Sequence, residues 1–198
     1  MADKTAFDIL FEKLSNKGMK PERRISERNF VVPGVDRMSN TKYIIARNKT
    51  FYFCAYDSHG TSAYSSNTFT GIYSTINLPA ETECYIYKKD WTDQILRTGK
   101  HKTEIKYIDE NLTITSATKW TPSLILSPAD VNLFLEIHIS IVPLKIVIQH
   151  DYLSLIEELK DKTIIGIETD TWLYEDSDLD TFINLGGQLI ENITKACA

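Results

Sequence analysis

YIDENLTITSATKWTPSLILSPADVNLFLEIHISIVPLKIVIQHDYLSLIEE, residues 107–158, is the stretch of sequence that decides the fold. Apolar and polar residues alternate from Leu112 to Ala117, with Leu112, Ile114 and Ser116 on one side. Such alternation predicts a β-strand that is buried on one face. The stretch therefore begins with a strand that belongs to a sheet.

A helix is predicted to follow this strand. Ser127 is a good N-cap, Pro128 occupies the first helical position, where its missing N–H costs nothing, and Asp130 lies in the positively polarised first turn. Pro143 prevents the helix from continuing. One side of the helix carries residues spaced as an amphipathic helix requires: Val131, Phe134, Leu135 and His138.

Two further apolar runs, 144–148 and 152–156, flank the turn-like tripeptide Gln149-His150-Asp151. This pattern predicts an antiparallel hairpin. Residues 153–159 also fit the helical period, so a helix is the alternative for the second run.

Three features of the chain are shared with a known family: Phe69-x-Gly71 opening an earlier strand, Thr115 and Ala117 in the first strand, and Leu126-Ser127-Pro128 at the helix start. Over residues 69–158 they resemble a family of uncharacterised bacterial domains of unknown function. Members of that family are often attached to a membrane by an upstream hydrophobic hairpin, which this chain lacks. The resemblance implies a related fold and a bacterial source, and it brings no catalytic residues.

The N-terminal region is predicted to be an accessory to the main domain. Residues 3–17 fit an amphipathic helix that docks on the rest of the protein. Residues 18–40 carry two prolines, several charges and no sustained period, which favours a linker or an extended wrap. We therefore expect a single domain, 1–198, with the helix and linker in 1–40 and the main domain in 41–198.

The rest of the chain predicts an α+β fold. Residues 42–56 contain two β-rich runs around Asn48-Lys49, which indicates a hairpin. Further strands are expected at 69–76, 83–87 and 164–171, and a long helix at 178–196. Together these elements make a mostly antiparallel sheet of about seven strands flanked by helices, including an N-terminal helix and a long C-terminal helix.

Composition excludes several classes of protein. The chain is 42% hydrophobic and 25% charged, and no segment approaches the ~20 apolar residues that span a bilayer. With no secretory signal at the N-terminus, we expect a cytoplasmic protein that is not bound to a membrane. A net charge of −5 argues against nucleic acid as a partner.

Charge is unevenly distributed along the chain. Residues 1–50 contain 11 Lys and Arg against 6 Asp and Glu, whereas residues 151–198 contain 3 against 11. Such asymmetry can steer a partner or let the ends of neighbouring copies attract each other.

Glu168, Asp170 and Trp172 form the most suggestive set of site residues. At alternate positions of a strand, all three are expected on one face, with two carboxylates beside an aromatic platform. Glu168 and Asp170 are thus candidate catalytic residues for a small hydrolase or a cation-dependent enzyme. The alternative is an edge strand that is kept from aggregating by its charges, and we favour it.

Other candidate binding residues lie in two predicted loops. Trp91 and a basic tip at 97–102, which includes Lys100 and Lys102, belong to one loop. Asp57 and His59 lie in an earlier polar loop, 57–68. These residues favour a binding role over catalysis.

Motifs for catalysis, metals or cofactors are missing. Cys54, Cys84 and Cys197 show no metal-ligand spacing, and we expect Cys54 and Cys84 to be buried free thiols. Ser116-x-x-Lys119 lacks the companion motifs of its enzyme class, and no phosphate-binding loop or nucleophile elbow is present. We therefore predict no metal or cofactor and a non-enzymatic module that binds an unknown protein partner or forms a homo-oligomer.

Overall fold

The computed structural model describes residues 4–32, 35–59, 67–90, 100–116, 126–153 and 156–197. These residues form a nine-stranded sheet in which every neighbouring pair is antiparallel, in the order β1-β2-β3-β4-β9-β8-β5-β7-β6. The α+β prediction is confirmed, with a larger sheet than expected because the residues before position 42 also form strands.

The strands are β1 (Lys20–Val32), β2 (Val35–Arg47), β3 (Tyr52–His59), β4 (Asn67–Thr75), β5 (Cys84–Lys88), β6 (Lys100–His101), β7 (Leu112–Ser116), β8 (Lys145–His150) and β9 (Thr163–Thr169). The helices are α1 (Ala6–Asn16), α3 (Lys106–Asn111), α4 (Pro128–Ser140), α5 (Asp176–Thr181) and α6 (Gly187–Ala196). A π-helical turn, Phe182–Gly186, joins α5 to α6, and a 3₁₀ turn spans Glu157–Leu159.

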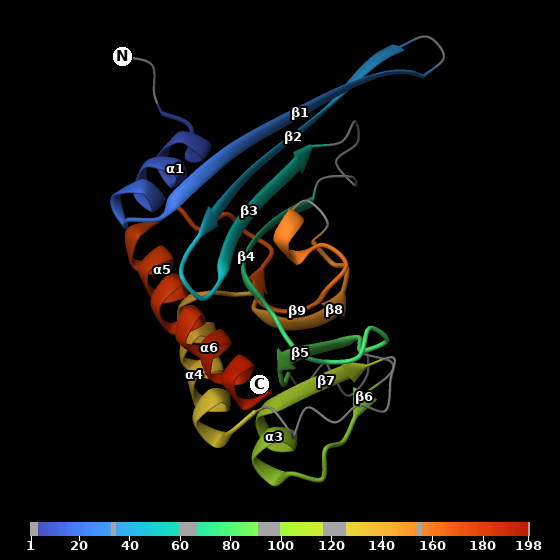
Figure 1. Ribbon diagram of the computed structural model, residues 1–198, viewed down its shortest axis with the longest axis vertical. Helices are drawn as coiled ribbons and strands as arrows, with labels where there is room; N and C mark the ends of the chain where they lie inside the picture. The colour runs from blue at the N-terminus through green and yellow to red at the C-terminus, as the bar shows by residue number, and fades with distance from the viewer. Residues whose placement is uncertain are drawn as a thin grey trace.

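Helices α1, α4, α5 and α6 cover one side of the sheet, which we call the helix face (Figure 1). The core beneath them is aliphatic and aromatic, and Leu10, Phe134 and Phe182 are completely buried in it. The C-terminal helix approaches the sheet closely at Gly187, where a Cβ atom would lie 2.6 Å from the ring of Phe51. A residue without a side chain is therefore required at this contact.

Helix α4 begins as predicted. The Ser127 hydroxyl accepts a hydrogen bond from the Asp130 N–H at 3.2 Å, and the Asp130 carboxylate accepts one from the Ser127 N–H at 3.0 Å. This capping box satisfies two backbone donors at the helix start. The same carboxylate accepts a bond from the Asn192 amide at 3.0 Å, which ties α4 to α6.

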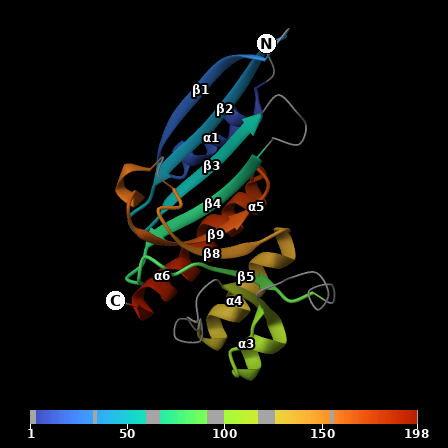
Figure 2. The ribbon, with the colours of Figure 1, turned by 90° about the vertical axis from the view of Figure 1, so that its right-hand side faces the viewer.

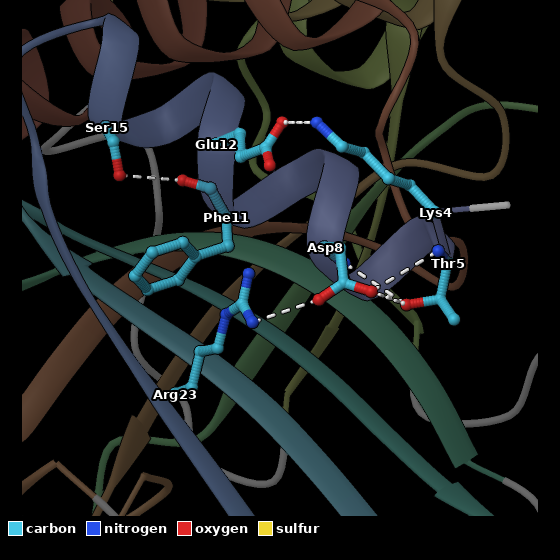
Figure 3. A network of polar contacts seen from close by, with 7 residues as sticks. All are labelled: Lys4, Thr5, Asp8, Phe11, Glu12, Ser15 and Arg23. Atoms are coloured by element: carbon cyan, nitrogen blue, oxygen red, sulfur yellow. Dashed lines mark hydrogen bonds and ion pairs between the residues drawn. The ribbon is translucent and has the colours of Figure 1, made fainter. Parts of the chain in front are cut away.

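Helix α1 docks on the sheet, as expected from its apolar stripe. Phe7, Leu10 and Leu14 are buried. On its outer side, the Arg23 guanidinium of β1 lies 2.9 Å from the Asp8 carboxylate and 3.9 Å from the centre of the Phe11 ring (Figure 3). The helix is thus held by both apolar burial and an ion pair.

The prediction of a linker at 18–40 is wrong. Lys20–Val32 and Val35–Arg47 pair in register as a long hairpin, whose far end extends beyond the other strands (Figure 1). Only Asn40–Arg47 of β2 pairs with β3. Charged residues on both sides of β1 hid the alternation, because a projecting edge strand does not need a buried apolar face.

The predicted hairpin at 144–156 is also wrong. Strand β8 pairs with β9, and the described residues between them, 151–153 and 156–162, lie on the side of the sheet opposite the helices (Figure 2). Asp151 and Asp161, both with positive φ, open and close this connection. Leu153, Ile156 and Leu159 are buried, and Glu157–Leu159 forms a 3₁₀ turn. Neither a strand nor an α-helix is found among the described residues of 153–159.

The two oppositely charged regions meet within one molecule. Lys13 of α1 lies 3.0 Å from the Asp176 carboxylate, and Lys17 pairs with Asp180. Part of the charge that the sequence offers to a partner is therefore neutralised between α1 and α5.

Candidate functional site

The side of the sheet opposite the helices is lined with tyrosines, and we call it the tyrosine face. Its ring-bearing residues come from β2, β3, β4 and β5, which follow one another along the chain, and from the segment after β8. They are Tyr43, Tyr52, Tyr56, Phe69, Tyr73, Tyr85 and Tyr152. The sequence contained the signal, because these tyrosines occupy positions that alternate with helix-face residues such as Ile44, Ile72 and Ile86.

Four residues of this face form a ladder across four strands. Arg24 lies opposite Tyr43, Tyr43 opposite Tyr56, and Tyr56 opposite Phe69. The Arg24 guanidinium is 6.0 Å from the Tyr43 ring centre, and the ring centres are 6.5 Å apart for Tyr43 and Tyr56 and 5.1 Å for Tyr56 and Phe69. Tyr43 and Tyr56 are half-buried, so the ladder offers aromatic surface to a ligand.

A groove of about 580 Å³ lies beside the ladder, between strands β1–β3 and the 3₁₀ turn. The Arg47 guanidinium lies 5.6 Å from the ring centre of Tyr52 at its edge. The groove has an apolar lining of Ile45, Tyr52 and Ile156, and a charged rim of Lys20, Glu22, Arg24, Arg47, Glu157 and Glu158. Three cations and three carboxylates thus surround an apolar centre.

Glu168 lies at the centre of the tyrosine face and is only 2% exposed. It belongs to β9, between β4 and β8, so the edge strand expected for it is wrong. The Tyr73 hydroxyl donates to its Oε2 at 2.8 Å, the Tyr152 hydroxyl lies 3.1 Å from the same oxygen, and Lys145 Nζ lies 2.9 Å from Oε1. Both carboxylate oxygens are therefore occupied by protein donors.

The surroundings of Glu168 keep these donors protonated. Burial, and then the negative charge of Glu168, raise the pKa values of Tyr73 and Tyr152 well above the usual range of tyrosine. Burial is the largest single cause and lowers the pKa of Lys145, but the charge and hydrogen bond of Glu168, with Asp170 and Tyr87, together outweigh it and the pKa is raised. The cluster is thus built to hold one carboxylate and has no general base with a pKa near neutrality among its donors.

Two glycines make room for Tyr73 in this cluster. The ring lies flat over the sheet, and a Cβ atom on Gly71 would be 2.2 Å from the Tyr73 hydroxyl, whereas one on Gly166 would be 2.3 Å from the ring. Gly166 is the cross-strand partner of Tyr73, and Gly71 that of Glu168. The tyrosine covers the glycines and so reaches Glu168.

Trp172 does not share the face of Glu168 and Asp170. Strand β9 ends at Thr169, and after it Trp172 packs on the helix face, 5.8 Å from the ring centre of Phe7. Its indole N–H donates to the Tyr56 carbonyl at 2.9 Å. Asp170 stays close to Glu168 through Lys145, at 3.5 Å, but its side chain is 61% exposed.

The structure instead brings Trp172 together with Asp57. Both line a cavity of about 290 Å³ at the start of α1, to which Lys42 also contributes. Asp57 accepts a hydrogen bond from the Thr68 hydroxyl at 2.7 Å. The cavity is smaller than the groove on the tyrosine face, and its carboxylate already has a partner.

The remaining candidate residues lie elsewhere. Lys102 is exposed just after β6, whose backbone includes Lys100, and His59 ends β3. Trp91 lies outside the described residues. Strand β6 is at the opposite edge of the sheet from β1, so the backbone at Lys100 is far in sheet order from the ladder on β1–β4.

Within the described ranges, no group of three His, Cys, Asp or Glu residues is arranged to hold a metal ion. No helix among these residues is long and apolar enough to cross a bilayer. Cys54 and Cys84 are buried free thiols, as predicted, and burial raises the pKa of Cys84 to about 12.

The fold and the site together define an α+β protein with one sheet face closed by helices and the other lined with tyrosines. No family model, curated protein or solved structure matches the chain. The resemblance to bacterial domains of unknown function stays a prediction.

Proposed function

We propose that the protein is a non-enzymatic interaction module that binds an extended segment of a protein partner on the tyrosine face. The observation that carries this proposal is the Arg24–Tyr43–Tyr56–Phe69 ladder, which runs beside the groove at Tyr52. Tyrosine and arginine are enriched at protein interfaces, where large rigid rings bury much surface at a small entropic cost.

The charges around the groove favour a peptide over a polyanion. Lys20, Arg24 and Arg47 are balanced by Glu22, Glu157 and Glu158. A phosphate backbone would gain little from this neutral rim, and a chain of net charge −5 would repel it. A segment that carries both charges and an apolar centre matches the groove.

An enzyme that uses Glu168 and Asp170 receives less support. The Glu168 carboxylate is buried, and both of its oxygens already contact protein donors, from Tyr73, Tyr152 and Lys145. The aromatic platform assigned to that enzyme, Trp172, packs on the opposite face. We place the module in the bacterial cytoplasm, where buried unpaired thiols such as Cys54 and Cys84 are usual.

The proposal is tested by selecting binders from a phage-displayed library of random linear peptides on the immobilised protein. The affinity of each selected peptide is then measured for the wild type and for Tyr52→Ala. Because Tyr52 lines the groove under Arg47, we expect the variant to weaken binding by at least about tenfold, the effect of losing an aromatic anchor.

Tyr174→Ala is the matched control. Tyr174 is an exposed tyrosine outside the tyrosine-face core, so its loss should leave peptide affinity unchanged. The proposal fails if no linear peptide is enriched, or if the selected peptides bind the Tyr52→Ala variant as tightly as the wild type.

A further inference from the structure

Strand β1 is a long edge of the sheet. Its 13 residues pair with β2 on one side, and no described strand pairs with the other side. Ile25, near its middle, is 56% exposed, an unusual position for a large apolar residue on a strand edge. A free edge of this length presents a row of backbone donors and acceptors to another strand.

The sequence of β1 is charge-symmetric about Ile25. Glu22 and Arg28 stand three residues to either side of it, and Arg23 and Glu27 stand two residues to either side. When such a strand is laid antiparallel against a copy of itself, each acidic residue faces a basic one.

We propose that β1 pairs antiparallel with β1 of a second copy of this chain, with Ile25 opposite Ile25. In this register Glu22 lies opposite Arg28, and Arg23 lies opposite Glu27. Two-fold symmetry repeats both pairs, so four complementary pairs surround two isoleucines that cover each other. Opposite charges and apolar residues directly across an antiparallel pair both stabilise it.

Neighbouring registers lack this complementarity. In a continuous sheet, residues that lie directly opposite each other point to the same face. A two-fold axis perpendicular to the sheet also keeps each residue on its own face. The axis must therefore lie between the two copies of one residue, which pair with each other. Centring the pair on Arg24 places like charges opposite each other, and centring it on Ser26 places Arg24 opposite Arg28. The charges of β1 therefore specify the register centred on Ile25.

The dimer has a defined shape. It joins the two sheets into one, with the helices of both copies on one side and both tyrosine faces on the other. Glu22 takes part in this pairing and also belongs to the rim of the groove. The backbone hydrogen bonds of this pairing run along the edge of β1, so the pairing does not require a bound peptide.

The test uses charge reversal at residues 22 and 28. The pair formed by residues 23 and 27 is avoided because Arg23 already holds α1 through Asp8 (Figure 3). Sedimentation equilibrium of the full chain gives the dimer dissociation constant. We expect Glu22→Arg and Arg28→Glu each to raise it at least about tenfold, since each places like charges opposite each other twice.

An equimolar mixture of the two variants is the decisive measurement. In the heterodimer every facing pair again consists of one acid and one base, so the mixture should recover the affinity of the wild type. Variants that had merely misfolded would not recover it. Ile25→Asp should abolish the dimer, and Lys49→Glu, an exposed charge reversal at the β2–β3 turn, should leave it intact.

Three results overturn the proposal. The first is a wild-type chain that stays monomeric up to about 1 mM, the weakest affinity a specific dimer would need. The second is a dimer that is insensitive to the single reversals. The third is a mixture of the variants that stays as monomeric as its components. None of these results bears on peptide binding at Tyr52.

Discussion

The two faces of the sheet use different chemistry for the same backbone. On the helix face, aliphatic residues and phenylalanines such as Phe134 and Phe182 are completely buried under helices. On the tyrosine face, most rings carry hydroxyl groups, Glu168 is buried among them, and Tyr152, Leu153, Ile156 and Leu159 pack over the sheet. The segments 151–153 and 156–162 lie on this side (Figure 2). The helix face is thus closed by apolar packing, whereas the tyrosine face combines a buried polar cluster with half-buried aromatic rings.

The largest expected difference between the faces is in the cost of removing a ring. Phe134→Ala should lower the free energy of unfolding by about 3–5 kcal/mol, because the ring is fully enclosed and leaves a cavity. Tyr43→Ala should cost about 1 kcal/mol, since the ring is half-buried and loses mainly its cross-strand contacts. Urea denaturation of both variants measures this; similar costs would mean that the tyrosine face is as closed as the other.

The second prediction concerns Glu168, the buried carboxylate of the tyrosine face. Glu168→Gln should destabilise the protein by about 2–3 kcal/mol, because Tyr73, Tyr152 and Lys145 lose a charged acceptor. Asp170→Asn is the matched control, since Asp170 also approaches Lys145 but is mostly exposed. Its change should stay within about 0.5 kcal/mol. Equal losses of unfolding free energy in the two variants would show that the burial of Glu168 does not determine its contribution to stability.

The third prediction tests the packing of Tyr73 over its glycines. Gly166→Ala should cost about 1–2 kcal/mol, because the new methyl group would lie 2.3 Å from the Tyr73 ring and must displace it. In a Tyr73→Val background the same change should be neutral or stabilising, since alanine suits a strand better than glycine. A double-mutant cycle by urea denaturation gives the coupling, and additive costs would contradict the contact.

Capping residues and apolar alternation correctly predicted those helices and strands that are determined by residues close together in the sequence. Ser127, Pro128 and Asp130 specified the start of α4, and the alternation in 164–171 located β9 to within two residues. The β1–β2 hairpin and the path of 151–162 could not be predicted in the same way. The charged β1 has no apolar face, and the partner of β8 is decided by the whole sheet and not by the nearest apolar run.

The candidate site was only partly visible in the sequence for a similar reason. Glu168 was singled out as a carboxylate, but its burial depends on Tyr73, Gly71 and Tyr152, which lie far from it along the chain. Trp172 was misplaced because alternation was continued past the last residue of the strand. The segregation of tyrosines to one face was readable, strand by strand, from positions alone.

The smallest expected effect is a loss of stability of the tyrosine face at alkaline pH. Because the pKa of Tyr73 is raised in the folded protein, the folded state keeps its proton where the unfolded state has lost it. This contribution is fully present below about pH 10, the usual pKa of tyrosine, and is lost as the pH rises further, by up to about 1.4 kcal/mol per pH unit. Lys145 has the same sign, since its pKa is also raised, and adds to the loss above about pH 10.4.

Urea denaturation between pH 9 and 10.5 tests this. Over that range the wild type should lose less than about 1 kcal/mol through Tyr73, and Tyr73→Phe should show a shallower decline, although it starts from a lower stability without the hydroxyl bond to Glu168. Tyr174→Phe removes an exposed phenol and should leave the decline unchanged. An identical decline in the Tyr73→Phe variant would mean that the alkaline sensitivity does not arise from Tyr73.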